Sequence, residues 1–549
     1  MWAPDALQKT LEDWLSVGPV HGVYWLGALD PEGDLSTMDL TTWHEALRIR
    51  VKALYVTMRT LYQQIAAPGT FLVSATRLGG QHGYDPSGAF APLGGAVAGF
   101  TKTYKRERID AMVKVVDFEA EANASDLAQI VIEETLRDPA AVEIGYKDGL
   151  RWTMSLEEQP AVDGQAGLTL DKDTVFVITG AAGSIVSAIT ADLAAVSGGT
   201  FYLLDLVPKP DPDNPDLGRF VSEKEALKRD LFARIQTRGE RATPALVEKQ
   251  LAALERAHAA QCAIDAVQAA GGRANYFSVN LTDADAVAHV INQVRQQSGR
   301  IDVLLHAAGM ERSHLLPDKD PREFDLIFDV KSDGWFNLLH AIGKMPLKAT
   351  VVFSSIAGRF GNAGQADYSS ANDLLCKITS SFRTTRPATR ALAIDWSAWG
   401  GIGMATRGSI PKMMELAGID MLPPEAGIPL VRRELTVGGT RGEIVVGQRL
   451  GILLNEWDPT GGVEVSQSDD QKRLSAPGPM VAKVASMGIH QGLSIDTVLD
   501  PAVQPFLHDH QIDGTPVLPG VMGIEAFAEA ALCMLPGWHI EAIENVNFL

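Results

Sequence analysis

Four side chains with proton-transfer chemistry stand at fixed spacing in the second half of the chain. Tyr368 follows Ser355 by thirteen residues, and Asn372 follows Tyr368 by four, which places the last two on one helical face. Lys331 lies upstream in "FDLIFDVKSDGWFNLL", a helix otherwise apolar on that side. Tyrosine is a poor acid at neutral pH because its ordinary pKa is about 10, and a nearby cation lowers that pKa. The pattern predicts that Tyr368 donates a proton beside Lys331. Ser355 would bind a carbonyl oxygen, and Asn372 would order a water.

A glycine turn after an apolar strand indicates a nucleotide site. "VFVITGAAGSIVSAI" predicts strand, turn and helix: Gly180 permits the tight turn, and Gly183 lets a pyrophosphate approach the helix N-terminus. Val186 replaces the usual third glycine, and the motif alone also fits a plain strand-to-helix turn. The next strand ends at Asp205, whose carboxylate can bind ribose hydroxyls and would repel a 2′-phosphate. The small residues of "HAAG" at 306–309 let a cofactor lie against the backbone.

Together these residues resemble the ketoreductase domain of type I polyketide synthases and related fatty acid synthases, members of the short-chain dehydrogenase/reductase superfamily. In that family the lysine precedes the serine strand and the asparagine stands four residues after the tyrosine, as here. The resemblance implies reduction of a β-ketoacyl thioester with NADPH or NADH. The acyl chain would arrive on the phosphopantetheine of an acyl carrier protein. "IDWSAWGGIGMA" at 394–405 resembles the segment that closes over nicotinamide, ahead of a mobile lid at about 405–422.

The resemblance also implies a set of cofactor contacts. These are Thr179, Gly180, Gly183, Ser184, Ile185, Asp205, Asn280, Leu281, His306, Ala307, Ala308, Gly309, Gly403 and Met404. NADPH is expected from the family, but Asp205 stands where the family tends to carry Ser or Gly before an arginine that binds the 2′-phosphate, which favours NADH. Glu311 lies where the family carries an Asp pair, and Phe360 replaces a Trp, so no alcohol configuration is predicted.

A second motif lies near the C-terminus, in "HDHQIDGTPVLPG" at 508–520. His510, Gly514 and Pro519 resemble the H-x3-G-x4-P motif of dehydratase domains in the same synthases, which form a hot-dog fold of a curved sheet around one long helix. There the histidine removes the α-proton of a β-hydroxyacyl thioester, and an Asp of a second hot-dog unit helps the hydroxyl leave. Since the chain stops at Leu549, inside the first unit, we expect no dehydratase activity from it. A buried or turn histidine is the alternative.

Alternating strands and helices must position these residues, and they predict an α/β fold with two Rossmann-like halves. Residues 1–165 form a degenerate structural half: "TFLVSATRLGGQHG" echoes "TVVFSSIAGRFGN", but no Tyr stands thirteen residues after Ser74 as Tyr368 does after Ser355. Residues 166–455 form the doubly wound catalytic half, with an insertion at about 207–265. In that insertion Thr243 and Pro244 begin a helix, and a solvated surface insertion is favoured over a partner-docking arm. A linker at 456–479 precedes a partial α+β hot-dog segment at 480–549.

Composition indicates a cytoplasmic protein that binds neither nucleic acid nor membranes. The net charge of its 549 residues is −20, and no apolar run reaches the ~18 residues of a membrane span. The three cysteines are too widely spaced for a metal or disulfide pattern. The expected partners are the carrier protein, a ketosynthase, an acyltransferase and the rest of the dehydratase, in a polyunsaturated-fatty-acid-synthase-like or polyketide megasynthase. Two alternatives stay open: a non-catalytic scaffold and a freestanding dehydrogenase of a small alcohol.

Overall fold

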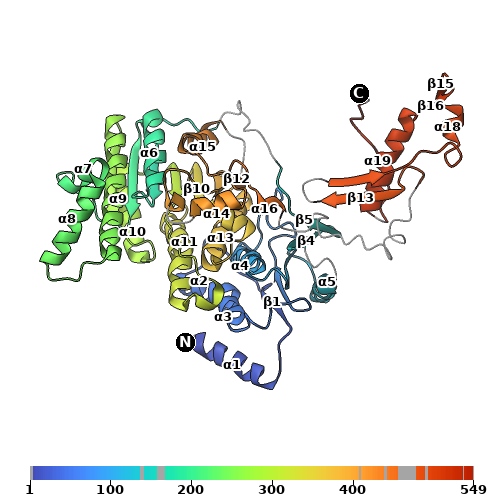
Figure 1. Ribbon diagram of the computed structural model, residues 1–549. Coiled ribbons are helices and arrows are strands. Elements are labelled where there is room, and N and C mark those ends of the chain that lie inside the picture. The colour runs from blue at the N-terminus through green and yellow to red at the C-terminus, as the bar shows by residue number, and fades with distance from the viewer. Residues whose placement is uncertain are drawn as a thin grey trace. The chain divides into compact units, whose positions relative to one another are not determined.

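The computed structural model describes most of the chain and divides it into two compact units (Figure 1). The described residues are 4–136, 141–157, 167–406, 410–437, 442–455, 478–488, 492–535 and 537–547. The units comprise Met1–Thr135, Val142–Trp152 and Glu157–Leu453, and then Leu136–Ala141, Thr153–Leu156 and Leu454–Leu549. Most of the predicted linker, and residues 407–409 of the predicted lid, lie outside the described residues. Among the helices described, none is long and apolar enough to cross a membrane.

A seven-stranded parallel sheet forms the centre of the catalytic half, in the order β12-β11-β10-β9-β6-β7-β8. Its strands are β6 (Val175–Thr179), β7 (Thr200–Asp205), β8 (Arg273–Ser278), β9 (Val303–His306), β10 (Ala349–Ser355), β11 (Arg390–Trp396) and β12 (Gly442–Val446). Six of these strands were predicted from the sequence, and β12 was not. The order reverses between β6 and β9, and doubly wound sheets bind nucleotides at such a point, beyond the carboxyl ends of the strands.

Helices cover both faces of this sheet and begin and end at residues typical of helix termini. Asp283 and Asp320 cap two of them by accepting backbone N–H groups, and Gly198 and Gly299 end two in the left-handed region. The elements are α6 (Ser184–Ser197), α10 (Ala284–Ser298), η2 (Leu316–Asp318), α11 (Pro321–Ile342), α12 (Ile356–Phe360), α13 (Ala366–Thr385), η3 (Met404–Thr406), α14 (Ile410–Leu416), α15 (Pro424–Thr436) and α16 (Ile452–Asn455).

The inserted helices follow β7 and have a small apolar core of their own. They are α7 (Pro215–Ser222), α8 (Lys224–Thr237) and α9 (Pro244–Ala269), and Thr243 caps α9 as predicted. Leu227 and Leu231 of α8 pack with Val247 and Leu251 of α9 in this core. The C-terminal part of α9 instead buries Ala263, Ile264 and Val267 in the main core, which is the apolar cluster that includes Phe176 and Leu203 of the catalytic sheet. The end of the predicted insertion is therefore the ordinary crossover helix between β7 and β8, extended at its N-terminus.

The first half carries a smaller sheet in the order β1-β2-β3-β4-β5. Its elements are α1 (Pro4–Val17), β1 (Gly22–Ala28), α2 (Leu40–Leu47), η1 (Arg48–Lys52), α3 (Ala53–Thr60), β2 (Phe71–Thr76), α4 (Gly94–Glu107), β3 (Met112–Phe118), α5 (Ala124–Leu136), β4 (Glu143–Lys147) and β5 (Leu150–Thr153). The first four strands pair in parallel. Asp148 and Gly149 both have positive φ between β4 and β5, which is the turn that closes a two-residue hairpin. The predicted closing hairpin is confirmed.

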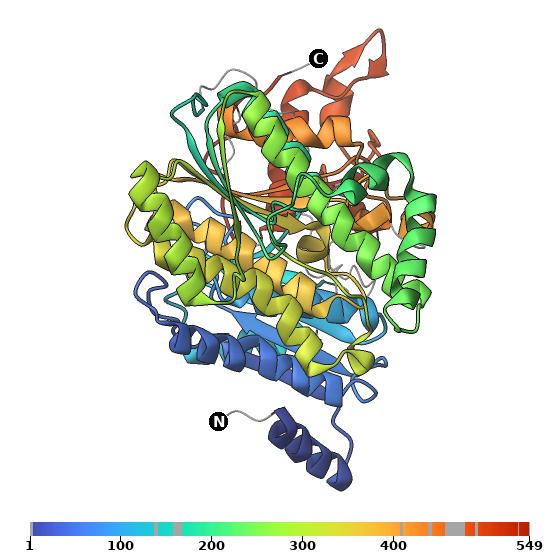
Figure 2. The same cartoon turned by 90° about the vertical axis from the view of Figure 1, so that its left-hand side faces the viewer.

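Helices of the two halves pack together in one layer between the sheets. A single apolar cluster includes Trp43 and Leu54 of the first half together with Phe328 and Trp335 of α11 and Leu374 of α13. In Figure 2 the yellow and gold helices α11 and α13 lie between the catalytic sheet and the blue first half. The indole nitrogen of Trp43 also donates to Asp333 Oδ1 at 2.8 Å. The degenerate half thus supports the helices that carry Lys331 and Tyr368.

A close backbone approach in this layer joins α4 to α13. A Cβ at Gly99 of α4 would lie 2.5 Å from the carbonyl oxygen of Ser369, so only glycine fits there. One turn further, the fully buried Lys102 ammonium lies 2.9 Å from Asp373 and 3.2 Å from Glu143 of β4. These contacts attach α13 to the first half by both packing and charge.

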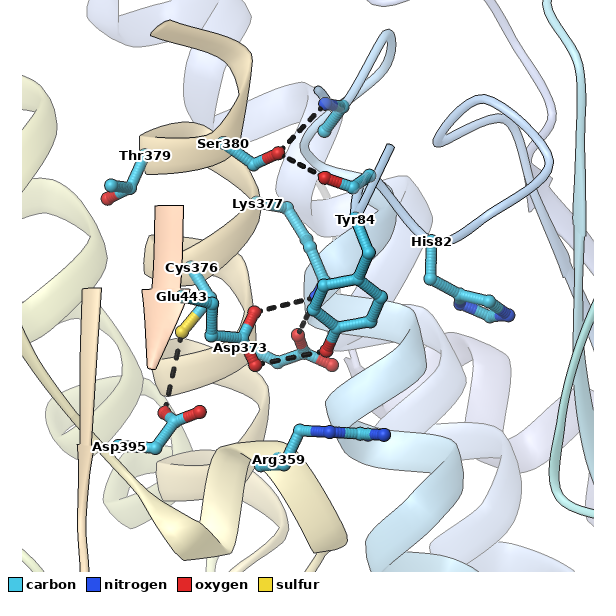
Figure 3. Close-up of polar contacts among 12 residues, drawn as sticks. His82, Tyr84, Arg359, Asp373, Cys376, Lys377, Thr379, Ser380, Asp395 and Glu443 are labelled. Carbon is cyan, nitrogen blue, oxygen red and sulfur yellow. Dashed lines mark hydrogen bonds and ion pairs between the residues drawn. The ribbon is translucent and has the colours of Figure 1, made fainter. Parts of the chain in front are cut away.

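The charge network continues across the interface to the last strand of the catalytic sheet (Figure 3). Lys377 Nζ lies 2.9 Å from Glu443 Oε2 and 3.8 Å from the ring centroid of Tyr84, which donates to Glu443 Oε1. Arg359 pairs with Glu143. Burial alone would raise the pKa of Glu443, yet Lys377 and Arg359 lower it to about 2. Three buried carboxylates therefore face three buried cations: Glu143, Asp373 and Glu443, and Lys102, Arg359 and Lys377.

Among its described residues, the second unit holds two antiparallel hairpins and one apolar helix. Its elements are β13 (Lys483–Gly488), β14 (Gly492–Asp496), α18 (Phe506–Asp509), β15 (Gln511–Ile512), β16 (Thr515–Pro516) and α19 (Gly520–Met534). The α19 helix exposes 69% of Val521 and 64% of Phe527. A long helix with exposed apolar side chains beside short strands is consistent with a partial hot-dog fold, in which more of the sheet would cover the helix.

We predict that Lys102→Met lowers the free energy of unfolding by about 3–5 kcal/mol, because Asp373 and Glu143 would lose a buried counter-charge. Urea unfolding followed by tryptophan fluorescence measures this change. The control is Lys412→Met, which removes a pair with Glu415 in which both side chains are exposed, and which should leave unfolding unchanged. Equal, small effects of both substitutions would contradict a structural role for the network.

Candidate active site

The predicted serine and tyrosine come together at the carboxyl end of β10. Ser355 is the last residue of β10 and caps α12 by accepting the backbone N–H of Ala357 at 3.1 Å. Tyr368 lies in the first turn of α13. Both side chains are partly exposed, as a site that receives a substrate requires. Ser355 ends the strand and Tyr368 lies at the start of the helix that follows α12, so both side chains belong to the carboxyl edge of the sheet.

Lys331 approaches the tyrosine from α11. Its side chain is buried, its ammonium donates to the carbonyl oxygen of Phe353 at 2.7 Å, and the nitrogen lies 5.6 Å from the centroid of the Tyr368 ring. Burial lowers the pKa of Lys331 to about 8. A Cβ at Gly309 would lie 2.7 Å from Lys331 Cε, so this glycine leaves the space through which the lysine passes. Lys331 is therefore placed to act on Tyr368 electrostatically.

Asn372 stands one turn after Tyr368 and has an unused acceptor. Its amide nitrogen donates to the backbone carbonyl of Tyr368 at 2.8 Å. Its oxygen is buried and has no hydrogen-bond partner among the described residues. A buried acceptor without a partner is costly, and a water molecule would satisfy it. This geometry fits the predicted water-ordering role.

Burial raises the pKa of the Tyr368 phenol to about 12. Interactions with Asn372 and Ser355 oppose this rise, and the negative charge of Glu311 adds to it. The phenol therefore keeps its proton at neutral pH. A cation close to it would stabilise the phenolate that forms when the proton leaves.

The glycine turn after β6 has the geometry of a phosphate-binding loop. Gly180 has φ +70°, and a Cβ there would lie 2.9 Å from the backbone of Ala307 and Ala308. Gly183 is the N-cap of α6 and provides no side-chain cap, so the first backbone N–H groups of the helix face outward. Helix N-termini of this kind bind phosphates. Val186 is buried in the main core, where it packs with apolar side chains of the catalytic half.

Three predicted cofactor contacts have side chains committed to protein partners. Thr179 Oγ1 accepts the N–H groups of Ala307 and Ala308 and contacts His306 Nδ1 at 2.9 Å. Burial and the charge of Lys331 lower the pKa of His306 to about 3, so this ring is neutral. Leu281 is buried in the shared core. These residues position the loops, and their direct contact with a cofactor stays a prediction.

The remaining predicted contacts line the same edge of the sheet. Ser184 Oγ accepts the N–H of Gly403 at 3.1 Å, which joins the segment after β11 to the start of α6. Ile185 lies beneath this glycine, since a Cβ at Gly403 would be 2.6 Å from its Cδ1. Met404 is partly exposed beside it. At the other end, the exposed Asn280 accepts the Thr282 hydroxyl at 3.0 Å.

Asp205 ends β7 as predicted, and its carboxylate accepts hydrogen bonds from three groups of the protein. Its two oxygens accept the backbone N–H groups of Ala182 and Val207, each at 3.0 Å. Arg256 of α9 donates to Asp205 Oδ1 at 2.6 Å. Arg256 was not among the predicted site residues, because a long polar helix gives no sign of which of its residues reaches a strand fifty-one positions earlier.

The second unit contains the other predicted catalytic residue. His510 is exposed, and its Nδ1 lies 2.8 Å from the carbonyl oxygen of Val517. A carbonyl only accepts, so Nδ1 carries the proton and a neutral ring has its lone pair on Nε2. Asp513 and Gly514, both with positive φ, turn the chain, and Pro519 is the N-cap of α19. The spacing of the motif therefore matches one hairpin followed by one helix.

Comparison with known proteins agrees with the resemblance seen in the sequence. Residues 234–401 match the KR domain family, and residues 479–549 match the polyketide synthase dehydratase domain family. The chain is 28% identical over 465 residues to a polyunsaturated fatty acid synthase polypeptide of Thraustochytrium sp., a match that covers 82% of this chain but 15% of that protein. It is 26% identical over 191 residues to the 3-oxoacyl-[acyl-carrier-protein] reductase FabG of Thermotoga maritima, covering 33% of this chain and 76% of that enzyme.

Solved structures show the same fold for the first unit. A ketoreductase domain from the bacillaene assembly line covers 78% of this chain and is itself covered to 93%, with a TM-score of 0.57 and 17% sequence identity. At that identity the likeness establishes the fold. Residues 234–401 are thus similar to KR domains and residues 479–549 to polyketide synthase dehydratase domains, and the first unit has the fold of the solved ketoreductase.

Proposed function

We propose that this chain reduces a β-ketoacyl thioester to the β-hydroxyacyl thioester, within a polyketide or fatty acid megasynthase. The observation that carries the proposal is the convergence of Ser355, Tyr368, Lys331 and Asn372 at the carboxyl edge of the catalytic sheet. The match to a reductase that acts on 3-oxoacyl carrier-protein substrates supports the substrate class. We further propose that the acyl chain arrives on the phosphopantetheine of an acyl carrier protein.

The proton-transfer residues have separate roles in this proposal. Ser355 hydrogen-bonds the β-carbonyl oxygen as negative charge develops on it. Tyr368 gives its phenolic proton to that oxygen, so the carbonyl becomes a hydroxyl. Lys331 stabilises the phenolate left behind, and a water on the free Asn372 oxygen begins the path that restores the proton.

The residues at the glycine turn fit a nicotinamide dinucleotide. The uncapped N-terminus of α6 would hold its pyrophosphate, and Gly180 keeps the loop tight against Ala307 and Ala308. When bound, a reduced nicotinamide supplies a hydride to the β-carbon. Gly403 would hold the segment after β11 at the nicotinamide end through its bond to Ser184.

For the dehydratase region we propose that His510 is the base of a dehydration site. The Nδ1–H bond to Val517 orients the ring and leaves Nε2 to take a proton. No hydrogen bond or ion pair joins a carboxylate to the His510 ring among the described residues. We therefore propose that this chain does not itself complete the elimination.

We predict that Tyr368→Phe lowers the turnover of a β-ketoacyl thioester by about 10²–10⁴-fold, because no proton donor remains. Nicotinamide absorbance, followed with NADPH and NADH in parallel, measures the loss. Nucleotide affinity should be unchanged. Tyr24→Phe, which removes a hydroxyl bonded to Thr135 in the first half, is the matched control and should retain full activity. A folded wild-type chain that turns over no thioester with either cofactor would favour the scaffold alternative.

The pH dependence of reduction should follow Lys331. Its pKa of about 8 in the folded chain means that the ammonium loses its proton as pH rises through that value. Since Tyr368 then has no cation beside it, kcat/KM for reduction should fall on the alkaline side. Lys331→Arg keeps its charge throughout and should move the decline to higher pH. A wild-type profile that stays flat through the alkaline range would refute this role.

The product should be the hydroxyacyl thioester alone. Mass spectrometry of the thioester after reaction should show the gain of two hydrogens and no loss of water, because no carboxylate is bonded to the His510 ring among the described residues. An enoyl product that disappears in His510→Ala would contradict the proposal for the dehydratase region while leaving the reductase proposal intact.

A further inference from the structure

The adenosine end of the cofactor site contains an arginine from the inserted helices. The guanidinium of Arg256 lies 2.6 Å from the Asp205 carboxylate at the end of β7. Asp205 is buried, with 2% of its side chain exposed, whereas 47% of the Arg256 side chain is exposed. The pair therefore presents its positive member to solvent.

The position of this arginine follows from how α9 is anchored. Ser187 of α6 donates to the backbone oxygen of Ala259 at 2.6 Å, which ties α9 to the helix that begins at the phosphate loop. Arg256 stands three residues before Ala259, about one helical turn toward the carboxyl edge of the sheet. The same helix thus forms the crossover to β8 and extends beyond the edge where β7 ends.

Asp205 is poorly available to a ribose. Its oxygens already accept N–H groups from Ala182, Val207 and Arg256. In the neighbouring strand β8, the Tyr276 hydroxyl donates to the carbonyl oxygen of Val207, the residue whose N–H group binds Asp205. Burial and the charge of Asp205 raise the pKa of Tyr276, so this group is neutral.

The charge that a ligand would meet here is set by Arg256. Asp205 alone would repel an anion, but the ion pair is neutral overall and its exposed part is the guanidinium. Arginine has five N–H donors in a planar fork that matches phosphate, and only one is used in the pair with Asp205.

We propose that Arg256 binds the 2′-phosphate on the adenosine ribose of the cofactor, with Asp205 as the anchor that orients the guanidinium. This inference rests on the proposed function, since it requires that a nicotinamide dinucleotide occupies the site. Arg256 belongs to the crossover helix α9 and takes the role that the family gives to an arginine directly after β7. The chain therefore prefers NADPH. The acidic strand end, which in the sequence favoured NADH, becomes part of the phosphate site.

The test is calorimetric titration of the full chain with ADP-ribose and with 2′-phospho-ADP-ribose, neither of which contains nicotinamide. We expect the phosphorylated ligand to bind about tenfold or more tightly, as a charge-assisted hydrogen bond allows. Arg256→Ala should abolish this preference without changing the affinity for ADP-ribose. Arg256→Lys should retain part of it. The matched control is Arg229→Ala, which removes an exposed arginine of α8 and should behave as wild type.

Two results would overturn the inference and are distinguishable. If both ligands bind the wild-type chain equally, or if Arg256→Ala leaves their affinity ratio unchanged, Arg256 does not read the 2′-phosphate, and the proposed reductase function stands. If neither ligand binds the folded wild-type chain, the nucleotide site itself fails, and the proposed function fails with it.

Discussion

The contact between α4 and α13 is the constraint on which the catalytic half depends. Gly99 allows the two backbones to meet near Ser369, and Lys102 then reaches Asp373 in an interior that excludes water. Tyr368 lies in the first turn of the same helix, so the first half helps to position the proposed proton donor. The degenerate half therefore holds in place the helix that carries Tyr368.

Burial acts on the catalytic pair from both sides. It raises the pKa of Tyr368 to about 12 and lowers the pKa of Lys331 to about 8, because each charged form loses its hydration. Loss of the phenolic proton would place an anion near the Lys331 ammonium, so each charge would then have the counter-charge that replaces its lost hydration. In the interface network, ion pairing offsets the loss of hydration. Three buried cations face three buried carboxylates, and each charge has a partner of opposite sign.

The inserted helices combine a structural and a chemical role. The α7 and α8 helices form a small core with the N-terminal part of α9, and this support lets α9 extend beyond the sheet. Arg256 lies at the point where α9 passes the end of β7. The site at the adenosine end therefore depends on a segment that its polar composition assigns to the surface.

The sequence determined the local structure and the spacing of the reacting groups. Periodic apolar runs predicted six of the seven catalytic strands, Thr243 predicted the start of α9, and the spacing of Ser355, Tyr368 and Asn372 predicted the site. These features are encoded within a few turns or strands, where neighbours in the sequence are neighbours in space. The edge strand β12 was the one strand of this sheet not predicted.

Contacts between distant segments could be known only from the folded chain. Asp205 and Arg256 are separated by fifty-one residues, and Arg359 and Glu143 by 216. The side chains of Thr179 and His306, which the family resemblance implies as cofactor contacts, contact each other in the core. Hydrophobic periodicity records which face of an element is buried. Which partner that face meets, and which charges it neutralises, depends on how the helices of two halves pack in one layer.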